Sequence, residues 1–105
     1  MILHCVYCAL RADLAPGAWE EVVGALETFA LGLDGVLAFE HGPNRDFEAK
    51  SAPYTAGFIM RCESRGALEV YAEHPRHKAL GQALTALCEG GGAGIMVFDL
   101  ELGAP

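Results

Sequence analysis

The residues with the clearest capacity for chemistry lie in one short segment that contains Tyr71 and His77. His77 falls on the same helical stripe as Leu80 and Leu84, which places its imidazole toward the protein interior in the first turn of a helix. The positive end of a helix and partial burial both favour neutral histidine, which accepts a proton at pH 7. Tyr71 lies one turn before the break in this helical region and is placed to offer a hydroxyl to the same cavity. His4 is placed to add a third polar group. The segment therefore predicts a pocket suited to proton transfer.

The same residue types also have structural explanations. His77 is alternatively a core histidine bonded to a backbone carbonyl, and Tyr71 an ordinary core residue of an amphipathic helix. His74 directly precedes Pro75 and is expected to serve the helix junction there, because proline disfavours helical geometry in the residue before it. His74 and His77 lie across this break with no carboxylate partner at motif spacing, so no metal site is predicted.

The composition restricts the class of protein. The 105 residues carry a net charge of −7, and 52% of them are hydrophobic. This acidic balance argues against nucleic-acid binding, which needs concentrated Lys and Arg, and no apolar run is long enough for a transmembrane helix. Because no secretory signal is recognisable, we expect a cytoplasmic protein with free thiols at Cys5, Cys8, Cys62 and Cys88. The length fits a single domain over residues 1–105.

Two further motifs are interpreted as structural. Cys5 and Cys8 have C-x-x-C spacing but lie in an apolar stretch that reads as a strand. Alternation along a strand sends them to opposite faces, so they are not expected to share a metal or a disulfide. The glycine-rich segment Gly90–Gly94 precedes a strand, whereas a phosphate-binding loop precedes a helix. It is therefore expected to be a flexible connection.

Hydrophobic periodicity predicts four strands and two helical regions. The strands are expected over residues 2–10, 36–41, 54–63 and 95–102. The first helix is expected to begin near Pro16 and to end at Gly35, although Asp34-Gly35 is also typical of a turn. The second helical region is expected to begin at Ser64, break at Pro75 and restart there. This β-α-β-β-α-β order predicts an α+β fold of the ferredoxin-like type, a four-stranded antiparallel sheet with helices on one face.

The hydrophobic surplus predicts a partner. The first strand places Val6 on one face and Leu3 and Tyr7 on the other, and the last strand is also apolar on both faces. An antiparallel sheet with one face in water should alternate apolar with polar residues. Because two helices cover only one face, we expect a homodimer that associates through the uncovered face of the sheet.

The sequence resembles the stress-responsive A/B barrel (Dabb) family. The most specific part of the resemblance is the pattern Ala-Leu-x-x-Tyr-x-x-His-Pro-x-His, here residues 67–77, and it is accompanied by the first strand and by the closing Val97-Phe98-Asp99. The family belongs to the dimeric α/β-barrel superfamily, in which two ferredoxin-like units join their sheets. The resemblance therefore implies the dimer that the strand faces also predict.

The resemblance also implies roles for individual residues. In a plant member that closes a linear polyketide, the tyrosine and the second histidine of the motif are catalytic, and they match Tyr71 and His77. A histidine of its first strand lies in the site and matches His4. In contrast, Ala56 stands where members commonly carry a histidine, and Gly90–Gly94 adds residues before the last strand. The expected apolar wall of the pocket consists of Val6, Val23, Leu26 and Phe39.

Three functions remain open on this basis. The first is a cofactor-independent enzyme of the cyclase or isomerase kind that acts on a small apolar molecule with an enolisable carbonyl. The second is a stress-related protein that binds such a molecule without converting it. The third is the oxygen chemistry of monooxygenase-type or haem-degrading members of the superfamily. Neither a cofactor nor a metal is expected.

Overall fold

A computed structural model describes residues 1–103 of the chain. The strands and helices alternate in the predicted order, with the second helical region divided in two. The elements are β1 (Ile2–Cys8), α1 (Ala18–Leu31), β2 (Val36–Pro43), β3 (Ala56–Cys62), α2 (Arg65–Glu73), α3 (Pro75–Ala86), a short 3-10 turn η1 (Gly91–Gly94) and β4 (Ile95–Glu101).

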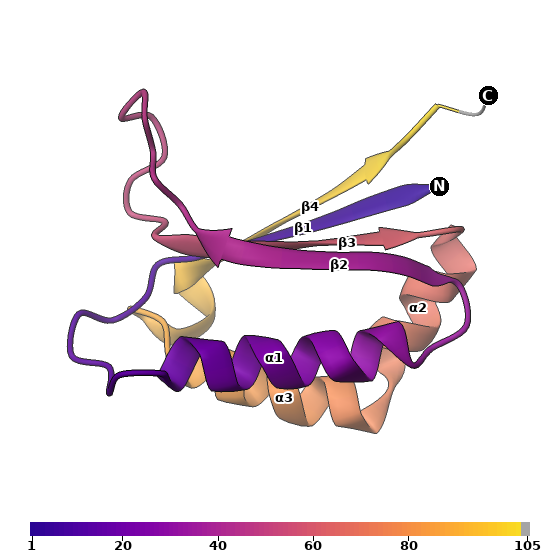
Figure 1. Ribbon diagram of the computed structural model, residues 1–105, viewed down its shortest axis with the longest axis horizontal. Coiled ribbons are helices and arrows are strands. Elements are labelled where there is room, and N and C mark those ends of the chain that lie inside the picture. Colours follow the sequence, from indigo (N-terminus) through magenta and orange to yellow (C-terminus); the bar gives the residue numbers. More distant parts are fainter. Residues whose placement is uncertain (104–105) are drawn as a thin grey trace.

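The four strands form one antiparallel sheet in the order β2-β3-β1-β4. All three helices lie on one side of this sheet, and the loop between β2 and β3 rises on the other side (Figure 1). This is the ferredoxin-like α+β fold that the sequence predicts. No helix within residues 1–103 is long and apolar enough to cross a membrane.

The first helix ends earlier than its apolar stripe suggests. It begins after Gly17, carries Glu20 and Glu21 in its first turn, where acidic residues are favourable, and is capped by Gly32. The predicted end at Gly35 is therefore wrong. Gly35 lies in the following turn with φ 85°, and a Cβ there would come within 2.6 Å of the Ala67 Cβ. The glycine is needed for this close approach and not as a helix cap.

The break between α2 and α3 confirms the predicted junction. Ser64 caps α2 by accepting a hydrogen bond from the Ala67 amide at 3.2 Å. His74 leaves the helical region with ψ 135°, Pro75 opens α3, and the His74 Nδ1 accepts from the Arg76 amide at 3.0 Å. The junction turns the chain so that α2 and α3 present their side chains to one space under the sheet.

The other differences from the predicted elements are small. The second strand continues to Pro43, two residues beyond the prediction, and the third begins at Ala56 instead of Tyr54. The expected flexible connection at Gly90–Gly94 contains the single turn η1. These ends differ because local composition marks a boundary only within a few residues.

The hydrophobic core lies between the sheet and the helices. Its central side chains include Val23, Leu26, Met60 and Tyr71, each at most 1% exposed. All four cysteines are free. Cys8 belongs to the core, whereas Cys5 lies on the opposite face of the sheet with its cross-strand partners. The two cysteines thus lie on opposite faces, as the alternation predicts.

The side of the sheet opposite the helices, here called the open face, is also apolar. Cross-strand partners share a face of a sheet, so the register groups the side chains of this surface. Ile59, Phe98 and Leu100 are 40%, 47% and 50% exposed. The apolar residues that the register places on the open face are Leu3, Cys5, Tyr7, Ala38, Ile59, Met96, Phe98 and Leu100, and the charged Glu40 and Arg61 lie on the same face.

Candidate functional site

A cavity of about 620 Å³ lies between the sheet, α1, α2 and α3, and we call it the helix-side cavity. Cavities of this size hold small organic molecules. The three predicted polar residues His4, Tyr71 and His77 all line it. They come from β1, α2 and α3, so the tertiary structure brings His4 next to Tyr71 and His77, from which α1, β2 and β3 separate it in the sequence.

His77 is held in an orientation that defines its tautomer. Its Nδ1 lies 3.0 Å from the Ala72 carbonyl oxygen. A carbonyl only accepts hydrogen bonds, so Nδ1 carries the proton and the Nε2 of the neutral ring is left as an acceptor. Burial lowers the pKa of His77, the Ala72 carbonyl partly opposes this change, and the nearby His4 lowers the pKa further. His77 is thus a neutral base at pH 7.

Tyr71 provides a buried hydroxyl without a partner. The residue is 1% exposed, and its hydroxyl has no hydrogen-bond partner among the residues that the structure describes. Burial raises the pKa of Tyr71, and Cys62 raises it further, so the hydroxyl stays protonated at neutral pH. The Tyr71 and His77 ring centroids are 4.3 Å apart. A donor in such a place costs about 1–3 kcal/mol until something accepts its hydrogen bond.

His4 is oriented by a carboxylate on the neighbouring strand. Its Nδ1 lies 2.5 Å from the Asp99 Oδ1, where it donates a charge-assisted hydrogen bond. The two residues are direct cross-strand partners of β1 and β4. The His4 ring meets the Tyr71 ring edge-on with centroids 5.9 Å apart. His4 therefore forms one side of the cavity next to the unpartnered hydroxyl, in the position expected of it.

Aromatic packing holds Tyr71 from the other side. Phe29 of α1 stacks on the Tyr71 ring with centroids 5.9 Å apart. The His74 ring packs edge-on against Phe29 at 4.7 Å. His74, which caps α3, thus packs on Phe29, and Phe29 packs on Tyr71. These contacts connect the helix break to the cavity.

The predicted apolar wall is present only in part. Val6 and Leu26 line the helix-side cavity, as expected. Val23 and Phe39 are placed elsewhere, because Val23 is fully buried in the core and Phe39 stacks on Phe58 at 4.8 Å. Both belong to the core cluster between the sheet and the helices, but neither lines the cavity.

The sequence reasoning missed several residues of the cavity. The sequence marks Asp99 only as part of the family resemblance, whereas its register opposite His4 makes it the partner of that imidazole. On α3, Gly81 and Thr85 follow His77 at intervals of four, so extending that helical face would have found them. The remaining lining residues are Phe58, Ala72, Lys78, Gln82, Leu84, Ile95 and Val97.

Within residues 1–103, no group of three or more His, Cys, Asp or Glu side chains is arranged to hold a metal ion. A neutral imidazole acceptor, a buried hydroxyl donor and a carboxylate-oriented imidazole border one apolar space. This combination is suited to moving a proton on a small bound molecule.

Comparison with solved structures identifies relatives of the same fold. A dimeric ferredoxin-like protein of unknown function from Jannaschia sp. CCS1 is 39% identical, with a TM-score of 0.86, and the match covers 96% of this chain and 98% of that chain. A protein of Arabidopsis thaliana is 19% identical, with a TM-score of 0.85 and coverage of 100% and 98%.

A hydroxynitrile lyase from Passiflora edulis is 10% identical, with a TM-score of 0.80 and coverage of 99% and 94%. At such low identity, the plant structures show the fold alone. No match was found among curated proteins. The model of the stress responsive A/B barrel domain matches residues 2–102. The chain therefore belongs to the stress responsive A/B barrel (Dabb) family.

Proposed function

We propose that the helix-side cavity binds a small apolar molecule with an enolisable carbonyl group, and that His77 and Tyr71 catalyse proton transfer on it. The observation that carries this proposal is the pairing of a neutral His77, whose Nε2 is an acceptor, with the unpartnered Tyr71 hydroxyl. A protein interior rarely leaves a buried donor unsatisfied, and a ligand oxygen is a partner that would complete it.

The steps follow from the roles of the two groups. His77 Nε2 takes a proton from the carbon next to the carbonyl, and the Tyr71 hydroxyl donates a hydrogen bond to the oxygen where negative charge develops. His4, held by Asp99, orients the bound molecule from the β1 side. The resulting carbanion equivalent serves a cyclisation, an isomerisation or a lyase reaction, depending on the substrate.

The dimeric state belongs to the same proposal. We infer that two copies of the chain associate through their open faces. The support is the apolar open face, with Ile59, Phe98 and Leu100 between 40% and 50% exposed, and the dimeric state of the Jannaschia relative. Burying such a surface against a second copy removes it from water.

Deuterium exchange tests the proposed chemistry. We expect wild-type protein to accelerate the exchange of the α-protons of phenylacetone with solvent deuterium, measured by NMR. The exchange rate with the His77→Gln variant should be about 10²–10⁴-fold lower, because this is the usual contribution of a general base. Tyr71→Phe should also slow exchange, because it removes the donor and keeps the ring.

A matched histidine variant controls for general effects. His41 lies on the edge strand β2, and its Nε2 is 3.7 Å from the Glu27 carboxylate, away from the helix-side cavity. His41→Gln should exchange phenylacetone at the wild-type rate. Equal rates in all variants would overturn the assignment of His77 and Tyr71. Saturable binding of phenylacetone without exchange would instead favour the non-catalytic ligand-binding protein.

A further inference from the structure

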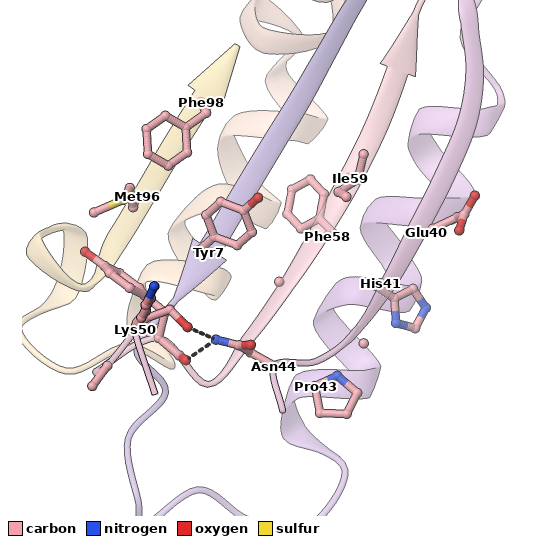
Figure 2. A pocket seen from close by; sticks show the side chains of 15 residues that line it. Tyr7, Glu40, His41, Pro43, Asn44, Lys50, Phe58, Ile59, Met96 and Phe98 are labelled. Carbon is pink, nitrogen blue, oxygen red and sulfur yellow. Dashed lines mark hydrogen bonds between the residues drawn. The ribbon is translucent and has the colours of Figure 1, made fainter. Parts of the chain in front are cut away.

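A second cavity lies on the opposite side of the sheet from His77 and Tyr71. It has a volume of about 750 Å³ and is bordered by the open face and by the base of the β2–β3 loop. Figure 2 shows Tyr7, Met96 and Phe98 along one side of this open-face cavity, with Asn44 and Lys50 from the loop at its end. Its wall thus combines aromatic and apolar side chains with the polar side chains of Glu40, His41, Asn44, Lys50 and Ser51, and no side chain of residues 1–103 fills it.

The adjoining loop, residues 44–55, carries an aromatic side chain that is almost fully exposed within the part of the chain that the structure describes. Phe47 is 93% exposed, the highest value among the large exposed hydrophobic residues of the described chain. The loop rises from the sheet on the side away from the helices (Figure 1). The base of this loop borders the open-face cavity, so the exposed Phe47 ring is available for a contact with another molecule.

Side-chain hydrogen bonds hold the loop in this position. Asp46 Oδ1 accepts from the Lys50 amide at 2.8 Å, the Ser51 amide at 3.0 Å and the Ser51 hydroxyl at 2.7 Å. Asn44 Nδ2 donates to the Ser51 hydroxyl at 2.8 Å and to the Tyr54 carbonyl at 2.9 Å (Figure 2). Because these bonds tie the loop together at both ends, Phe47 cannot fold back onto its own sheet without breaking them.

We propose that residues 44–55 form a dimerisation arm and that Phe47 of each protomer packs into the open-face cavity of a second copy of this chain. The inference rests on the proposed homodimer and adds a specific contact to it. In a twofold dimer, each protomer presents the same surface to its partner. One exposed side chain and one cavity per chain therefore form two identical contacts in each dimer. The cavity is continuous with the apolar open face, and the Jannaschia relative is dimeric.

Sedimentation of Phe47→Ser tests the arm. The variant should raise the dimer dissociation constant by about a hundredfold, because two phenylalanine contacts are lost per dimer. Val70 is also an exposed apolar residue, at 58%, but it lies on α2 on the helix side. Val70→Ser should therefore leave the constant unchanged. A wild-type constant for Phe47→Ser overturns the inference.

Cross-linking between two different variants tests the position of the contact. All four native cysteines are buried. Phe47→Cys and Met96→Cys chains, mixed and treated with oxidised glutathione, should form a disulfide-linked species of twice the chain mass. Val70→Cys mixed with Met96→Cys should not form it. Absence of the linked species in the first mixture overturns the proposed docking position.

The outcomes separate this inference from the homodimer itself. If wild-type protein sediments as an 11.1 kDa monomer at micromolar concentration, the homodimer fails and the arm fails with it. If wild-type protein is a dimer that Phe98→Asp disrupts and Phe47→Ser does not, the open-face dimer stands and only the arm is wrong.

Discussion

The two faces of the sheet differ in chemistry more than in exposure. Val97 and Phe98 are neighbours on β4 and are 48% and 47% exposed, yet they belong to opposite faces. Val97 lines the helix-side cavity, whose polar groups converge on Tyr71, whereas Phe98 belongs to the continuous apolar open face. Exposed apolar area alone therefore does not distinguish the two faces, and the converging polar groups on the helix side do.

The contrast has a physical reason. Three helices cover one side of the sheet and leave a space that holds a buried donor and an imidazole acceptor. The other side has no cover within the protomer, so its apolar rows gain free energy only when a second molecule packs on them. This difference is the basis for proposing a small-molecule site on one face and a homodimer interface on the other.

The largest expected effect comes from a charge on the open face. Phe98→Asp should raise the dimer dissociation constant at least about a thousandfold, because a carboxylate buried without a partner costs several kcal/mol in each copy. Sedimentation velocity across a concentration series measures this constant.

The neighbouring residue supplies the control for this charge. Val97→Asp should keep the wild-type dissociation constant and reduce phenylacetone exchange, because its side chain enters the helix-side cavity. Similar effects of the two variants on dimerisation would remove the distinction between the faces.

Truncating a side chain on each side of the sheet should affect the free energy of unfolding in different ways. The difference lies in how the loss depends on protein concentration. Leu26→Ala should lower the free energy of unfolding by about 2–5 kcal/mol at every concentration, because the 1% exposed side chain leaves a cavity. Ile59→Ala, at 40% exposure, should act mainly at concentrations where the dimer forms. Urea unfolding at 1 μM and at 100 μM measures both, and a concentration-independent loss for Ile59→Ala would contradict the open-face interface.

Tyr71→Phe should make the protein more stable and less active. Removing a buried hydroxyl without a partner should raise the free energy of unfolding by about 1 kcal/mol while phenylacetone exchange falls. Thermal and urea unfolding of the ligand-free protein give the stability. A destabilised Tyr71→Phe would mean that the hydroxyl has a structural role.

The smallest expected effect is the titration of one imidazole. The pKa of His77 should lie below the ordinary value of 6.5, because burial disfavours its charged form. Folding then favours the neutral ring, so this contribution to stability is complete above pH 6.5 and declines as the pH falls below it. NMR of the His77 ring protons measures the midpoint, and His77→Gln assigns the signal. A midpoint above 6.5 would contradict the neutral base.

Periodicity was sufficient for most of the fold and for the centre of the site. The stripe through His77 and Leu80, and the His74-Pro75 break, each depend on neighbours a few residues away, so sequence spacing expresses them directly. Gly35 shows where local sequence patterns are not sufficient to predict the structure. The local sequence allows both a helix cap and an Asp34-Gly35 turn at this position, and the approach of Ala67, which lies in another element, is visible only in the folded chain.

The sequence by itself determined which residue types alternate on each strand, where the chain changes from strand to helix, and that Tyr71 and His77 share the interior. Only the tertiary structure decided that Asp99 lies opposite His4, that Phe39 packs into the core instead of the cavity, and that the Tyr71 hydroxyl has no partner. Periodicity is a property of neighbouring residues, whereas register, packing and hydrogen-bond satisfaction depend on elements that meet only after the chain has folded.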